Sequence, residues 1–268
     1  MSEQKEIIAV RRAPRFSPNS VDRDDAILHA VCEALQQKLS LTAPIPVIDE
    51  DNFAKAPTAA KVYVTMARSA AALKALGQKT EAGALCVNSV AGITYCQRAL
   101  LTELMRYHHI PMPAEEGKNG TWLKRGDAAA QSKGDVVFCP DRKALLKAIA
   151  GFTARGIYEY VTSAHVEGDL VKFYGVSATG FFRYYYPTDD GLSKFGQEQL
   201  NGQAHHYPFS STDLQTKAEA LAATVGLQIY GGDMIVTNDG SWYMIDFNDW
   251  PSFSRCREEA AEAIARLI

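Results

Sequence analysis

The chain has 268 residues, of which 47% are hydrophobic and 22% charged, and its formal net charge is −3. This composition predicts a globular protein with one large domain or two to three smaller lobes. The small negative charge, without a basic run, gives no reason to expect nucleic acid or an anionic membrane as a partner. Five scattered cysteines without a C-x-x-C pair argue against a disulfide framework and a zinc site. No segment is long and apolar enough for a signal peptide or a membrane span, so we expect a cytoplasmic protein.

The first part of the chain alternates between strand-like and helix-like segments. Apolar runs at residues 6–10, 45–48, 61–67 and 84–87 predict strands, and apolar residues at three-to-four spacing predict helices at 21–39 and 70–76. Gly77 is expected to end the second helix. The arginines Arg11, Arg12 and Arg15 follow the first strand, and we expect them in a solvated loop. A role in substrate binding is the alternative if this loop faces the C-terminal hairpin described below. Such alternation predicts a small lobe with a parallel sheet.

Beyond this lobe, a helix is predicted at residues 91–108. Pro111 and Pro113 cannot continue it, so they mark a linker. Residues 121–124 and 135–139 predict a strand pair, and a helix at 142–151 and a strand at 157–161 follow. Strands at 170–176 and 180–186, a helix at 211–225 and a last helix at 257–268 complete the prediction.

Two hydrophobic runs near the C-terminus, residues 233–236 and 242–245, flank an Asn-Asp-Gly turn and predict a β-hairpin. Asp233 opens the first strand, while Asp246 and Asn248 close the second and lie on one face of an extended chain. Three oxygen ligands side by side suit a hard cation such as Mg²⁺. Asp-x-Asn is also common in turns, so the pattern alone leaves an ordinary turn open.

Several motifs follow one another in a fixed order: Asn88-Ser89 before a helix with Arg98, HIPMP, a strand with Lys124, IYEYV, GDLVKFYGV, GGDMIV and IDFNDWP. Their order and spacing resemble the ATP-grasp superfamily, which holds ATP between two α+β lobes. The resemblance implies a fold of the α/β and α+β classes. It would have an N-terminal parallel-sheet lobe (1–90), a central lobe (91–160) and a C-terminal lobe with the metal site (161–268).

The resemblance also implies roles for single residues. Asp233, Asp246 and Asn248 match the Mg²⁺ ligands of the superfamily, and Arg98 and Lys124 match residues that contact the ATP phosphates. Each cation also has a plain alternative, a surface arginine on a helix for Arg98 and a lysine at the edge of the core for Lys124.

The remaining roles concern the adenosine and the substrate. Residues 157–161 match the hinge, and the alternative for them is a core strand. Lys172 matches a basic residue of the superfamily on a strand that faces the phosphates, and its alternation with the apolar residues beside it is consistent with a polar cleft wall. Arg255 matches residues that hold a substrate carboxylate, or it flanks the last helix. The adenosine contacts implied by the resemblance are Glu159, Tyr160 and Val161 at the adenine and Glu167 or Asp169 at the ribose.

An ATP- and Mg²⁺-dependent enzyme that acts on a small molecule is the function implied by this resemblance. Ligases of the glutathione synthetase-like type phosphorylate a carboxylate, and an amine then attacks the acylphosphate. Most of these ligases have Glu-x-Asn where this chain has Asp246-Phe247-Asn248, which is similar to the inositol polyphosphate 5/6-kinases. A kinase of a small polyol or inositol phosphate is therefore the alternative, although residues 125–134 lack the Gly-rich character and the histidine of the corresponding loop in those kinases.

A third possibility is a regulator that binds a nucleotide without catalysis. The presence of all the residues matched to metal and phosphate contacts argues against it. We expect no nucleic acid or membrane partner, and a homodimer is compatible with the sequence.

Overall fold

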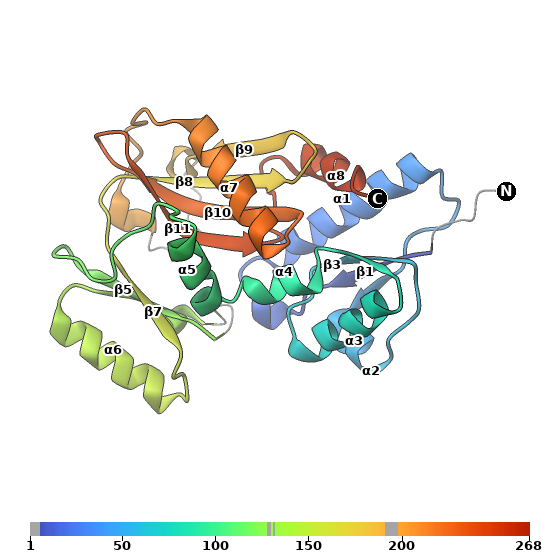
Figure 1. The fold of residues 1–268 in the computed structure, drawn as a ribbon, viewed down its shortest axis with the longest axis horizontal. Coiled ribbons are helices and arrows are strands. Elements are labelled where there is room, and N and C mark those ends of the chain that lie inside the picture. The colour runs from blue at the N-terminus through green and yellow to red at the C-terminus, as the bar shows by residue number, and fades with distance from the viewer. Residues whose placement is uncertain (1–5, 128–129, 131, 191–197) are drawn as a thin grey trace.

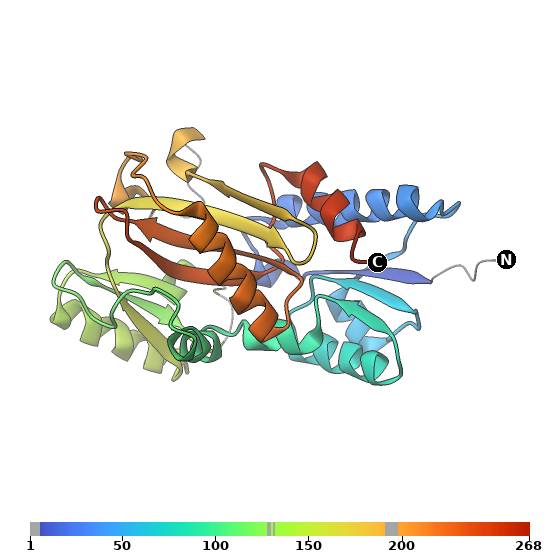
Figure 2. The ribbon, with the colours of Figure 1, turned by 45° about the horizontal axis from the view of Figure 1, so that its top comes forward.

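The computed structural model describes residues 6–127, 130, 132–190 and 198–268. Within these residues the strands form three sheets, with the orders β2-β1-β3-β4, β6-β5-β7 and β11-β10-β8-β9. Figure 1 shows them as three neighbouring lobes, and Figure 2 shows the same arrangement from a second side. No helix among the described residues is long and apolar enough to cross a membrane. All five cysteines are free thiols.

The N-terminal sheet is parallel, as the alternation of strands and helices predicts. Helix α1 and the last helix, α8, pack together on one of its faces, and α2 and α3 cover the other (Figure 2). The C-terminus of the chain therefore contributes to the N-terminal core. The elements of this part are β1 (Ile7–Arg11), η1 (Pro14–Phe16), α1 (Val21–Leu39), β2 (Val47–Asp49), α2 (Glu50–Lys55), β3 (Val62–Thr65), α3 (Ala70–Glu81), β4 (Leu85–Val87) and α8 (Arg257–Ala265).

Two helix predictions in this region are wrong. Helix α3 continues through Gly77, where a Cβ would meet no atom within 4 Å, so glycine carries no special conformation there. The helix predicted at 91–108 is two helices, α4 (Val90–Tyr95) and α5 (Arg98–Tyr107), separated by Cys96 and Gln97. The residues before the break, Ile93-Thr94-Tyr95, have modest helix propensity, and the freed amide of Ala99 donates to the carbonyl of Gly126 instead.

The central sheet is antiparallel and is covered on one face by α6 (Arg142–Ala154). It consists of β5 (Thr121–Arg125), β6 (Val136–Cys139), preceded by η2 (Lys133–Asp135), and β7 (Tyr160–Ala164). The strand predicted at residues 157–161 begins three residues later than expected. Ile157 instead packs against Phe152 in the core below α6, and its amide donates to the Phe152 carbonyl. Ile157 is therefore apolar because it packs against α6, and the strand does not begin there.

The C-terminal sheet contains the predicted hairpin, but both strands are longer than predicted, and Asp233 lies inside the first strand instead of opening it. Strand β10 (Ile229–Val236) runs antiparallel between β8 (Asp169–Val176) and β11 (Trp242–Asp249), and β9 (Phe181–Tyr185) lies at the far edge. Helix α7 (Ser211–Val225) packs on one face, where it buries Leu214 and Leu221. The short helices η3 (Pro187–Asp190) and η4 (Glu198–Asn201) lie in the connection from β9 to α7. The opposite face of the hairpin is free to line a site.

Candidate functional site

A cavity of about 640 Å³ is lined by residues from all three sheets and their connections. Trp122 and Lys124 come from β5, Lys172 from β8, and Arg12 and Arg68 from the loops that follow β1 and β3. Pockets of this size hold small-molecule ligands and cofactors. The residues that the three sheets direct into it therefore define the candidate site.

The hairpin presents three oxygen-bearing side chains to this cavity. Asp233 pairs directly with Asp246 across β10 and β11, and Asn248 lies two residues further along β11. The two strands approach closely here, because a Cβ on Gly232 would lie 2.4 Å from the backbone oxygen of Asp246. Among the described residues no group of three His, Cys, Asp or Glu side chains could hold a metal ion. A metal at the hairpin would therefore need the side-chain oxygen of Asn248 beside the two carboxylates, a set that suits Mg²⁺.

Three cations surround these oxygens. The Lys172 ammonium lies 3.1 Å from the Asp233 carboxylate, and one guanidinium nitrogen of Arg98 lies 3.8 Å from Asp246. Lys124 donates to the backbone carbonyl of Ile245, 2.8 Å away. Arg98 is the first residue of α5, and its Nη1 donates to the carbonyl of Arg125. Because the chain breaks before α5, a new helix begins at Arg98, which lines the cavity.

Burial and charge act in opposite directions on the acid and the base at the centre. Burial lowers the pKa of Lys124 to about 8, although Asp246 opposes the shift. Burial would raise the pKa of Asp246, but Arg98, Lys124, Lys172 and a hydrogen bond from Asn248 together hold it below its usual value. Asp246 is therefore a carboxylate at neutral pH, which is the form that binds a cation.

Seven of the residues predicted for the site line the cavity, and Arg255 is one of them. Its guanidinium donates to the carbonyls of Tyr186 and Pro187 and lies 5.4 Å from the centre of the Tyr185 ring. The other six are Arg98, Lys124, Lys172, Asp233, Asp246 and Asn248.

The residues predicted for the adenosine lie elsewhere. Glu159, Tyr160 and Val161 are not among the lining residues, and the end of β7 and the turn after it line the cavity instead, with Ser163, Ala164, His165 and Val166. Residues 163–166 line the cavity in place of 159–161 because β7 begins three residues later than predicted.

Neither acid considered for the ribose lines the cavity. Glu167 accepts a hydrogen bond from the Asn119 side chain. The buried carboxylate of Asp169 accepts from the backbone amides of His205 and Tyr207, at 2.7 and 2.8 Å. Asp169 thus fixes the segment that leads to α7.

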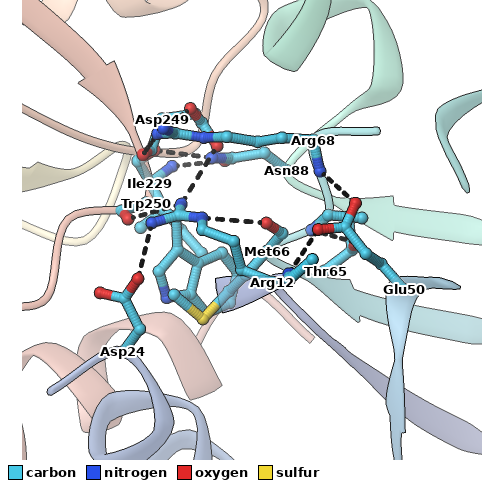
Figure 3. A network of polar contacts seen from close by, with 12 residues as sticks. Arg12, Asp24, Glu50, Thr65, Met66, Arg68, Asn88, Ile229, Asp249 and Trp250 are labelled. Carbon is cyan, nitrogen blue, oxygen red and sulfur yellow. Dashed lines mark hydrogen bonds and ion pairs between the residues drawn. The ribbon is translucent and has the colours of Figure 1, made fainter. Parts of the chain in front are cut away.

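A buried polar network at the N-terminal end of the cavity was not predicted (Figure 3). Arg12, expected in a solvated loop, is 7% exposed, and it donates to Asp24 and to the backbone oxygens of Met66 and Trp250. Arg68 donates to the Asp249 carboxylate at 2.6 Å. Both arginines follow strands of the parallel sheet, and they hold the end of β11.

The other two parallel strands are also followed by residues of this network. Glu50, after β2, accepts from the backbone amides of Ala13, Arg68 and Ser69. Asn88, after β4, exchanges hydrogen bonds with the backbone of Ile229 at the start of β10. The carboxyl edge of the N-terminal sheet is thus fixed to both strands of the hairpin (Figure 3).

No protein-family model and no curated protein matches the chain. Solved structures do match over nearly the whole length. The ATP-grasp ligase PsnB with its minimal precursor has a TM-score of 0.63 at 14% identity and covers 99% of this chain and 100% of its own. The D-alanine–D-alanine ligase of Bacillus anthracis has 0.64 at 11% identity, covering 98% and 96%. A RimK domain ATP-grasp protein of Sphaerobacter thermophilus has 0.65 at 16% identity, covering 97% and 99%.

The chain has the ATP-grasp fold. Identities of 11–16% establish this architecture alone. The Bacillus anthracis ligase has also been solved with ATP, and PsnB with Mg and ADP. In this ATP-grasp chain the cavity between the three sheets brings together the residues for which the sequence predicts metal and phosphate contacts.

Proposed function

We propose that this protein is an ATP-dependent, Mg²⁺-requiring ligase that activates a small carboxylate as an acylphosphate for attack by an amine. The observation that carries the proposal is the pairing of Asp233 with Asp246 in a cavity that also holds Lys124, Arg98 and Lys172. Two carboxylates and an amide oxygen beside three cations fit a metal-bound polyphosphate better than any uncharged ligand.

Asp233, Asp246 and Asn248 would hold Mg²⁺. Bound there, the ion would neutralise phosphate oxygens and orient the nucleotide. Lys124, Arg98 and Lys172 would stabilise the charge of the transferring phosphoryl group, a reaction in which the protein mainly supplies positioning and electrostatics. We further propose that residues 163–166 border the adenine in place of 159–161, since only the former line the cavity. Residues 1–90, 91–160 and 161–268 would act as the three lobes, except that α8 packs with α1 and joins the N-terminal lobe.

The pairing of the lining carboxylates favours a ligase over a kinase. Transfer to a hydroxyl in protein kinases uses a carboxylate that accepts the hydroxyl proton. Among the described lining residues, every carboxylate has a cation beside it. The pairs are Asp24 with Arg12, Asp249 with Arg68, Asp233 with Lys172 and Asp246 with Arg98. A carboxylate substrate is already deprotonated at neutral pH and needs no such base.

The test is to supply the purified protein with MgATP and mixtures of carboxylic acids and amines, and to measure ADP and free phosphate. A ligase releases phosphate in step with ADP, and only when an acid and an amine are both present. ADP with a phosphorylated product and no free phosphate would show a kinase. Asp239→Asn, in the exposed turn of the same hairpin, should behave like the parent, while Asp246→Asn should lose the activity.

A further inference from the structure

The N-terminal end of the cavity carries more arginines than carboxylates. Arg12, Arg23 and Arg68 line it, together with Asp24 and Asp249. This region lies beyond Asn248 and between the start of α1 and the loop after β11, so the residues assigned to Mg²⁺ and the phosphates do not account for it.

Both carboxylates are already paired with arginines, the buried Arg12 and the partly buried Arg68. Arg12 lies 3.0 Å from Asp24, and Arg68 lies 2.6 Å from Asp249. The second oxygen of Asp249 lies 3.5 Å from Arg12, so even this oxygen faces a cation of the chain. Each acid therefore faces at least one guanidinium group, although the Oδ2 of Asp249 accepts no hydrogen bond among the described residues.

Arg23 supplies the surplus charge. It stands in the first turn of α1, and its Nη2 donates to the backbone oxygen of Asn19 at 2.9 Å. Among the described residues it forms no ion pair with a carboxylate. Arg68 adds a second group with unused capacity, because its Nε is buried without a hydrogen-bond partner while Nη2 binds Asp249.

This charge distribution discriminates between ligands. An ammonium group placed here would meet three guanidinium groups and no unpaired carboxylate, whereas an anion would gain charge-assisted hydrogen bonds. Ser17, Ser252 and Ser254, which also line this end, bear hydroxyls that suit carboxylate oxygens.

We propose that the acid activated by this enzyme is a small carboxylate without an ammonium group, such as a plain, hydroxy or dicarboxylic acid, and not an α-amino acid. The inference rests on the proposed ligase function and specifies the substrate class for the same cavity. Arg23 and Arg68 determine the preference.

The experiment compares matched pairs of acids by isothermal titration of the full chain, with Mg²⁺ and a non-hydrolysable ATP analogue present. The pairs are lactate with alanine, each as both enantiomers, and succinate with L-aspartate, so that the members differ mainly at the ammonium group. We expect the acid without the ammonium group to bind about tenfold more tightly in at least one pair, or about 1.4 kcal/mol.

Arg23→Gln should lower the affinity for that acid about tenfold and leave the affinity for the nucleotide analogue unchanged. The matched control is Arg15→Gln, which removes an exposed arginine of the preceding loop that pairs with Asp51 outside the cavity. Arg68→Lys keeps a cation opposite Asp249, and it should also lower the affinity for the acid.

The inference is overturned if the amino acid binds as tightly as its partner in both pairs, if no acid binds, or if Arg23→Gln behaves like Arg15→Gln. The nucleotide titration is interpreted separately. Failure to bind the analogue would contradict the proposed ligase function, while the acid titrations, repeated without nucleotide, would still test the charge preference.

Discussion

Arg68 and Asp249 form an ion pair of 2.6 Å between residues that are 181 positions apart in the chain. The pair joins the end of β3 to the end of β11, one residue after Asn248. Arg12 reinforces the junction by donating to the backbone oxygen of Trp250. The N-terminal sheet therefore fixes the position of the end of β11.

Removal of Asp249 should destabilise the protein strongly. Asp249→Ala leaves the buried Arg12 and the partly buried Arg68 without their shared carboxylate. Breaking a buried ion pair by removing one partner costs about 3–5 kcal/mol. The free energy of unfolding from urea titration measures the effect. Asp51→Ala, which removes one partner of an exposed pair, should leave stability close to that of the parent. A loss below about 1 kcal/mol for Asp249→Ala would show that the network contributes little.

Two glycines should respond in opposite directions to the same substitution. Gly232→Ala places a Cβ 2.4 Å from the Asp246 oxygen and 2.5 Å from the Phe173 ring, so we expect a destabilisation of about 2 kcal/mol or more. Gly77→Ala, in an open position of α3, should stabilise the protein by about 0.5–1 kcal/mol, because alanine favours the helix. Thermal unfolding of both variants tests this, and equal effects of the same sign would contradict it.

The lowered pKa of Lys124 predicts a pH dependence of stability. Between pH 8 and 10.5 the unfolded chain holds a proton on Lys124 that the folded protein has lost, so stability rises with pH in this window. Relative to Lys124→Met, the parent should gain about 1 kcal/mol between pH 7 and 9. Unfolding of both proteins, without Mg²⁺ and nucleotide, provides the comparison. A difference that stays constant with pH would mean that burial does not shift this lysine.

The parts of the fold predicted most accurately depend on local pattern. Helices α1 and α7 have the bounds predicted for them, since strong apolar spacing ends at local signals such as Gly226, whose φ of 81° suits glycine. The hairpin follows from its turn residues, and its period of two sets the face of Asp246 and Asn248. The conformation of these two helices and of the hairpin can therefore be predicted from the residues within each element.

The segments that were misplaced depend on distant contacts. The apolar run at residues 157–161 could not reveal that Ile157 packs below α6, so the strand was predicted to begin too early. The residues predicted to contact the adenine, 159–161, accordingly do not line the cavity. Arg12 and the exposed Arg15 lie three residues apart in one segment, yet Arg12 is buried and donates to the backbone oxygen of Trp250, 238 positions away. Only the tertiary structure separates these two arginines.

We propose that the hairpin holds MgATP, and calorimetric titration of MgATP into the parent, Asp246→Asn and Asp239→Asn measures this binding. Asp246→Asn keeps the shape of the side chain but removes the charge that faces Arg98 and Lys124, whereas Asp239 lies in the exposed turn. We predict that the parent and Asp239→Asn bind MgATP equally, that Asp246→Asn binds at least about tenfold more weakly, and that omitting Mg²⁺ removes most of this difference. Equal affinity of all three proteins for MgATP would show that the hairpin does not bind it through Asp246.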